Sequence, residues 1–123
     1  MTNLATNIRP DILFHSNGLI EISSKISTLL CIEHGDVINI FEEKGEHYLY
    51  VAHKNPAGTF KGRCRKAKKT GRFMRTNWIE LSRTIISLTN APEAHYRVGD
   101  PQTINGKKVL PIITRNNLYA ERN

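Results

Sequence analysis

Basic side chains crowd into one short stretch of this 123-residue chain, KGRCRKAKKTGR at residues 61–72, where seven of twelve positions are Lys or Arg and none is acidic. Closely spaced cations repel one another, and a polyanion relieves that repulsion while releasing its own condensed counterions. Gly62 and Gly71 would let the backbone approach such a partner closely. We therefore predict that nucleic-acid phosphates are contacted by Lys61, Arg63, Arg65, Lys66, Lys68, Lys69, Arg72 and Arg75.

The spacing of the first basic residues suggests how they would be displayed. If Lys61, Arg63 and Arg65 lie on a strand, they share one face of a β-ribbon, and such a ribbon fits the major groove of duplex DNA. Contacts from these side chains to phosphates carry no base information, so the cognate sequence does not follow. Trp78 and Tyr96 could instead stack on the bases of RNA or of a single strand, although both positions are more typical of a core.

The charge is divided unevenly between the two halves of the chain. Residues 1–60 carry four Lys/Arg against seven Asp/Glu, a net charge of −3, whereas residues 61–123 carry fourteen against four, a net charge of +10. This asymmetry favours a polyanionic partner, or attraction between the halves themselves.

Cys31 and Cys64 lack any paired-ligand spacing and are interpreted as free thiols of a reducing compartment. No signal peptide or membrane span is indicated, so we expect a cytoplasmic protein.

Nothing in the chain has the spacing of a catalytic or metal centre. No nucleophile elbow, phosphate-binding loop or zinc-protease motif is present, and we predict neither an enzyme nor a cofactor. Glu21 and Glu80 could be paired carboxylates, but they are more simply the outward positions of strands or partners of the basic residues. The histidines are scattered without metal-ligand spacing: His15, His34, His47, His53 and His95.

Two parts of the chain match at a constant spacing of 59 residues. LIEISSKISTLL at 19–30 aligns with WIELSRTIISLT at 78–89, and KGEHYLYVAHKN at 44–55 aligns with NGKKVLPIITRN at 105–116 after about two extra residues. This pattern indicates two repeats, at about 8–56 and 60–117, within one compact domain spanning 1–123. Two amphipathic segments of similar composition are the alternative explanation.

Each repeat is predicted to fold as β-β-α-β-β. In the first, strands over 12–14 and 19–22 flank the turn Ser16-Asn17-Gly18, and Ser23 or Ser24 caps a short helix. Strands over 37–41 and 48–51 then form a second hairpin around Lys44-Gly45. A unit of this size cannot bury enough apolar surface alone, so two units must fold around each other.

The run GLIEISSKISTLLCIEHGDVINIFEEKGEHYLYV resembles the AbrB/SpoVT-type swapped-hairpin DNA-binding family. The family pattern is filled by Gly18, Ile20, Ile22, Leu30, Ile32, Gly35 and Asp36. Ser23 and Ser82 stand where the family has proline, Cys31 and Asn90 where it has glycine, and Ala94-His95 replaces the Gly-Asp pair in the second repeat. The family is normally dimeric, but two copies in one chain, as in MraZ-like proteins, imply an intramolecular swapped-hairpin pseudo-dimer barrel, mainly β with short helices.

The resemblance also bears on function. In the family, the amino-terminal hairpin region presents arginines to DNA, and the basic stretch lies at the matching place in the second repeat. We therefore expect a small protein that binds duplex DNA, as a transcriptional regulator or a nucleoid-type factor. RNA or single-strand binding, and an antitoxin-like protein-interaction module, remain the alternatives. No membrane partner is expected, and self-association into a homo-oligomer is left open.

Overall fold

The computed structural model describes residues 9–58, 61–66 and 73–119, which form nine strands and two short helices. The first half contains β1 (Ile12–Phe14), β2 (Leu19–Ser23), α1 (Ser24–Leu29), β3 (Val37–Glu43) and β4 (Glu46–His53). The second half contains β5 (Arg65–Lys66), β6 (Phe73–Asn77), α2 (Ile79–Ile86), β7 (Ala94–Val98), β8 (Gln102–Ile104) and β9 (Lys107–Ile113). The expected mainly β fold with short helices is confirmed.

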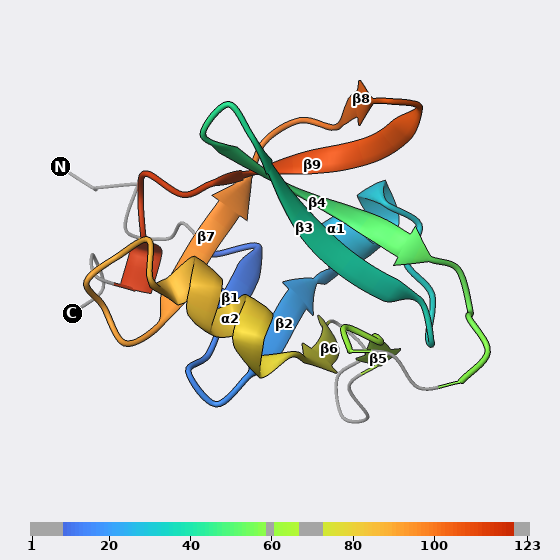
Figure 1. Cartoon of the computed structure of the whole chain (residues 1–123), viewed down its shortest axis with the longest axis horizontal. Helices are drawn as coiled ribbons and strands as arrows, with labels where there is room; N and C mark the ends of the chain where they lie inside the picture. The colour runs from blue at the N-terminus through green and yellow to red at the C-terminus, as the bar shows by residue number, and fades with distance from the viewer. Residues whose placement is uncertain (1–8, 59–60, 67–72, 120–123) are drawn as a thin grey trace, which may run out of the picture.

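The strands form one antiparallel sheet that curls into a half-barrel (Figure 1). Its order is β3-β4-β9-β7-β1-β2-β6-β5, with β8 paired to β9 beside this path. Strands from the two halves of the chain are therefore interleaved: β4 pairs with β9, β1 with β7, and β2 with β6. The helix α1 packs against β2 and β6, and α2 packs against β1 and β2.

The first half folds as its local sequence predicts. Gly18 takes a φ of 99° in the turn before β2, and the side chain of Asn17 accepts the backbone N–H of Leu19. Alternate residues of β2 are buried, because a strand presents successive side chains to opposite faces. The hydroxyl of Ser23 accepts the N–H of Ile26 and caps α1, as expected.

The second half differs from the expected alignment. Ile79 and Leu81, expected on a strand in register with Ile20 and Ile22, lie instead in the first turn of α2, with Trp78 at its N-cap. The strand that precedes this helix is β6, whose inward side chains are Met74 and Thr76. A short apolar run such as WIEL does not distinguish strand from helix by periodicity, so the constant spacing placed this strand five residues too late, at Trp78 instead of Phe73.

The second half also has one strand more than the expected β-β-α-β-β. Residues 99–101, Gly-Asp-Pro, separate β7 from β8, and Pro101 lacks the N–H that a continuous strand would use. The β8–β9 turn at Asn105-Gly106 nevertheless has the same left-handed conformation as the β3–β4 turn at Lys44-Gly45, with φ near 51° and 78° against 51° and 80°. The matched segments at 44–55 and 105–116 therefore do form matching hairpin turns.

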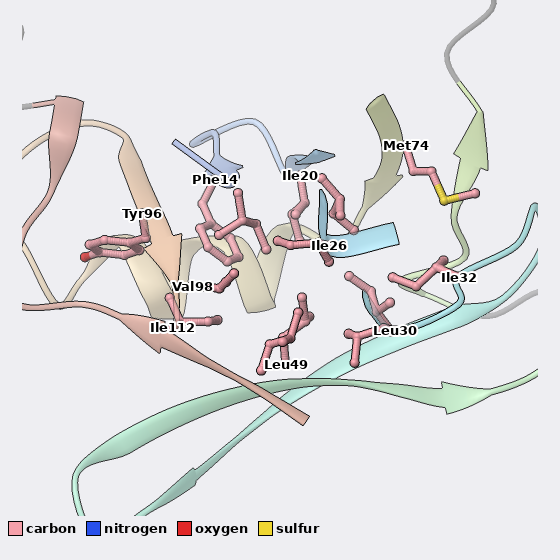
Figure 2. Close-up of a cluster of buried hydrophobic side chains, with 14 of the residues drawn as sticks. Phe14, Ile20, Ile26, Leu30, Ile32, Leu49, Met74, Tyr96, Val98 and Ile112 are labelled. Carbon is pink, nitrogen blue, oxygen red and sulfur yellow. The ribbon is translucent and has the colours of Figure 1, made fainter. Parts of the chain in front are cut away.

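One hydrophobic cluster draws on both halves of the chain. Figure 2 shows side chains of β1, β2 and α1 meeting those of β4, β7 and β9 inside the curled sheet. Its fully buried members include Phe14, Ile20, Ile26, Leu49, Tyr96, Leu110 and Ile112. Because each half supplies part of the same interior, neither half buries its own apolar residues without the other.

A seam of backbone hydrogen bonds joins residues 62–64 to residues 35–38. The N–H of Cys64 donates to the carbonyl of Asp36 at 2.7 Å, the N–H of Gly35 to that of Cys64 at 2.8 Å, and the N–H of Ile38 to that of Gly62 at 3.1 Å. The seam links the strand at one end of the sheet order, β3, to the segment that leads into β5 at the other end.

The buried carboxylate of Asp36 holds the first-half side of this seam. It accepts hydrogen bonds from the N–H groups of Glu33 and Asn55 at 2.8 and 2.9 Å and from the ammonium of Lys54 at 2.7 Å. Burial alone would raise the pKa of Asp36, but these donors outweigh it and the pKa is lowered.

In the described part of the chain, neither helix has the length and apolar character needed to cross a membrane.

Gly62 gives a test of the seam with a matched control. A Cβ at Gly62 would lie 2.7 Å from the carbonyl oxygen of Ile38, whereas a Cβ at Gly45 would meet nothing within 4 Å, and both glycines have positive φ. We expect G45A to cost about 1 kcal/mol from left-handed strain, and G62A about 2–4 kcal/mol because the seam must also shift. Urea unfolding measures both, and equal losses would show that the close approach has no energetic weight.

Asp36 predicts an acid dependence. The pKa of Asp36 is lower in the folded protein than in the unfolded chain. Its contribution to stability is therefore complete above the unfolded-state pKa and is lost as the pH falls through the folded-state pKa. We expect D36N to be less stable than the parent by about 1–3 kcal/mol at pH 7. The difference should shrink below about pH 4, the ordinary pKa of an aspartate. Urea unfolding of both proteins at pH 7 and pH 3 checks this, and an unchanged difference would contradict the assignment.

Candidate nucleic-acid interface

The basic stretch enters the sheet rather than forming a separate loop. Residues 62–64 run along the seam, Arg65–Lys66 form β5, and β5 pairs with β6 in an antiparallel ribbon at one end of the sheet order. Figure 1 shows this ribbon well away from the β8–β9 hairpin. Lys68, Lys69 and Arg72, three of the predicted phosphate contacts, lie outside the described residues.

Lys61 and Arg63 have partners within the protein. Lys61 forms an ion pair with Glu80 on α2, and this hydrogen bond lowers the pKa of Glu80. The guanidinium of Arg63 donates to the carbonyls of Gly35, Pro56 and Gly58. The structure thus does not place Lys61, Arg63 and Arg65 on one strand face: Lys61 lies in a turn and Arg63 fastens the 55–58 loop.

Arg65 and Lys66 are exposed on opposite faces of β5, Arg65 on the outer face opposite Arg75 and Lys66 opposite the buried Met74. Both are exposed, and neither forms an ion pair with another described residue. Arg65 lies directly opposite Arg75 on β6, whose side chain is about half exposed. Like charges at directly opposed positions of an antiparallel pair are destabilising, so an anion placed across this pair would be attracted by both side chains.

Arg75 also forms an ion pair with an acidic residue on β2, the strand on the other side of β6 from β5. Its Nε lies 3.6 Å from Glu21, which faces it across the β2–β6 pair. Glu21 also receives a 2.8 Å hydrogen bond from His15, and Glu93 bridges His15 and His95 at 3.2 and 2.9 Å. Glu21 and Glu80 are therefore partners of the basic residues, one of the two roles expected for them.

On the part of this surface that contains His15 and His95, the carboxylates are hydrogen-bonded to these histidines, so neither histidine is presented as an unpaired cation. Burial raises the pKa of Glu93, but hydrogen bonds from His95 and His15 outweigh it and the pKa is lowered. Among the described residues, no cluster of three or more His, Cys, Asp or Glu side chains is arranged to hold a metal ion. The outward face thus changes from basic at β5–β6 to acidic and imidazole-rich beyond β2.

Sequence reasoning missed several residues beside the first residue of β6. Phe73 is 36% exposed and lies opposite Ser23, at the edge of a cavity of about 220 Å³. The cavity is also lined by Arg9 and Lys25, which come from just before β1 and from α1. At the constant spacing of 59 residues Phe73 corresponds to Phe14, which is fully buried, so the alignment gave no indication that Phe73 is exposed. A correct register for β6 would have shown that Phe73 and Arg75 share a face.

The two aromatic residues expected as alternative stacking platforms are engaged elsewhere. Tyr96 is fully buried in the core, and burial raises the pKa of its hydroxyl. Trp78 is partly buried against the core, and a Cβ at Gly62 would lie 3.1 Å from its ring. Gly62 therefore serves close packing inside the protein, not the approach of a phosphate; Gly71 lies outside the described residues.

Comparison of the chain with protein-family models, with curated proteins and with solved structures found no match. The resemblance to the swapped-hairpin family rests on the residues quoted above.

The two cysteines test whether the basic stretch is part of the folded sheet. Cys64 is fully buried, and burial with Asp36 nearby raises its pKa to about 12, although it lies between two arginines in sequence. Cys31 is exposed. A thiol reagent at pH 8 should therefore modify one cysteine rapidly in the native protein and both in urea, and C31S should remove the rapid reaction. Rapid native modification of Cys64 would show that the stretch is a solvated loop.

Proposed function

We propose that this chain is a small DNA-binding protein, a transcriptional regulator or nucleoid-type factor, that contacts duplex phosphates through the outer face of the β5–β6 ribbon. The observation that carries the proposal is the adjacency of Arg65 and Arg75, which lie directly opposite each other on the outer face of two paired strands. Lys66 is also exposed, but it lies opposite the buried Met74 and therefore on the other face of the ribbon. A two-stranded ribbon has dimensions suited to the major groove, where arginine and lysine reach both phosphates and base edges.

The net charge and its distribution support the same proposal. The second half of the chain has fourteen Lys/Arg against four Asp/Glu. Arg63 uses its charge within the protein, so the available cations of the described stretch are Arg65 and Lys66 together with Lys61 and Arg75, which must leave Glu80 and Glu21 to bind a phosphate. Lys68, Lys69 and Arg72 add three further charges between β5 and β6 in sequence.

We further propose that the sheet is an intramolecular swapped-hairpin pseudo-dimer. Three features support this. Strands β2 and β6 pair antiparallel about the central residues Glu21 and Arg75. The β1–β2 hairpin pairs with β7 of the second half, and the segment leading into the β5–β6 hairpin pairs with β3 of the first half. Cys31, at a position where the family has glycine, takes the left-handed φ of 53° that glycine favours.

The pseudo-dimer would present DNA with unlike sides. In the pseudo-twofold relation, Glu21 of the first hairpin corresponds to Arg75 of the second. The first hairpin therefore has a carboxylate at the position where the second has a guanidinium. Binding would then use one hairpin of each chain, and a palindromic site would not follow from the internal repeat. A dimeric assembly of whole chains would be needed to read two half-sites.

Charge-matched double variants test the footprint. We expect R65A/R75A, which removes both arginines of the outer face, to weaken duplex DNA binding by about tenfold or more at about 100 mM salt. The slope of log affinity against log salt should fall by about 2, because each phosphate contact contributes about 0.9. The control K107A/K108A removes the same charge from exposed positions of β9 and should leave affinity within about twofold. Fluorescence anisotropy across a salt series measures both.

Equal losses in the two double variants would show that net charge alone drives binding and would contradict the ribbon footprint. Parallel titrations with single-stranded DNA and with RNA of the same sequence distinguish the duplex proposal from its alternative. Tighter binding to either of those than to duplex at the same salt would overturn the duplex assignment.

A further inference from the structure

The cavity beside Phe73 combines chemical features that fit one kind of ligand. Phe73 lies on the outer face of β6, in line with Arg75, and is the one aromatic residue among the exposed large hydrophobic residues of the described chain. An exposed aromatic ring with an adjoining cavity is a surface on which a flat ring can stack. The volume of about 220 Å³ is several times the roughly 30 Å³ that a water molecule occupies in the liquid.

The polar lining of the cavity is cationic and hydroxylic. Arg9 and Lys25 line it together with Ser23 and Ser24. Among the described residues of the lining, Asp11 is the single acidic one, and it is buried and already engaged. Its carboxylate accepts the N–H of Val98 at 3.0 Å and lies 3.5 Å from the ammonium of Lys25 and 3.9 Å from the guanidinium of Arg97. Two cations, Lys25 and Arg97, thus lie beside this carboxylate, and Arg9 adds a further positive charge to the lining, so the cavity retains an attraction for a negative group.

The position of the cavity ties it to the proposed interface. Arg65 lies opposite Arg75 and Lys66 opposite Met74, so Phe73 is the next residue of β6 along the same ribbon. Its partner on the other side is Ser23, which caps α1. A nucleic-acid backbone that follows Arg65 and Arg75 would therefore pass the mouth of the cavity, because Phe73 lies on the same face.

We propose that this cavity receives one unpaired nucleotide of the bound nucleic acid, with its base stacked on Phe73 and its phosphate near Arg9 and Lys25. This inference rests on the proposed function and deepens it, because it adds recognition of a base that has left the helical stack. Each unpaired or weakly paired position costs less to extrude than a paired one, so the protein should prefer DNA that contains such a position. Stacking on an aromatic side chain is tolerant of base identity.

The test compares three labelled duplexes that differ at one position: a perfect duplex, the same duplex with one bulged adenosine, and the same bulge with an abasic nucleotide. We expect the parent protein to bind the adenosine bulge about 5- to 100-fold more tightly than either of the others, the range expected for stacking of one base. F73A should abolish this preference while its affinity for the perfect duplex stays within about twofold. F73Y should retain the preference, because the ring is kept.

Two controls separate the site from general effects. L88A removes another exposed apolar side chain, 46% exposed, which follows α2, and should not change the preference. Thermal unfolding of F73A should show that the variant remains folded, as its exposed position implies. Adenosine monophosphate is added as a competitor, and it should not displace the bulged duplex at concentrations that leave the perfect duplex bound.

Each other outcome overturns the proposal in a recognisable way. Equal affinity for the adenosine and abasic bulges would exclude base stacking, while duplex binding through β5–β6 would stand. Equal loss of perfect and bulged duplex binding in F73A would make Phe73 a structural residue only. Selective displacement by adenosine monophosphate would assign the cavity to a free nucleotide. Absence of binding to every nucleic acid would overturn both this inference and the proposed function.

Discussion

The seam between residues 62–64 and 35–38 is the constraint on which the rest of the structure depends. It is the place where the second half of the chain joins β3, and it is built from backbone hydrogen bonds, the buried carboxylate of Asp36 and the absence of a side chain at Gly62. A buried backbone polar group without a partner costs as much as a lost hydrogen bond, so opening any part of the seam is unfavourable. It fixes the start of β5 and hence the orientation of the basic ribbon.

This constraint divides the basic stretch into a structural part and a displayed part. The residues nearest the seam are used internally: Cys64 is buried, and the guanidinium of Arg63 donates to the carbonyls of Pro56 and Gly58 in the preceding loop and of Gly35 across the seam. From Arg65 onward the strand is free of the seam, and its side chains point to solvent. The count of Lys and Arg in the sequence therefore overstates the cations available to a partner, and the fold decides which of them are available.

Local signals account for what could be predicted from the sequence. The first-half hairpins followed from alternating apolar residues and the glycine turns at Gly18 and Gly45, because register there is set by neighbours in the chain. In the second half, Trp78 and Ile79 belong to an apolar run that fits either element, and packing of α2 against β1 decides the outcome. The role of Arg63 was equally hidden, since its acceptors come together only when the seam forms. Phe73 was missed because the strand register was wrong.

The pairing of Glu21 with Arg75 connects the proposed interface to the remainder of the sheet. A phosphate that approaches Arg75 competes with Glu21, whose other oxygen is held by His15 at 2.8 Å. Arg75 is about half exposed, so its ion pair with Glu21 is worth little in water and a phosphate can replace it at small cost. Arg65 has no such competitor among the described residues, and it repels Arg75 across the ribbon. The ribbon is therefore best neutralised from outside, where one bridging anion meets both arginines and leaves Glu21 with its histidine.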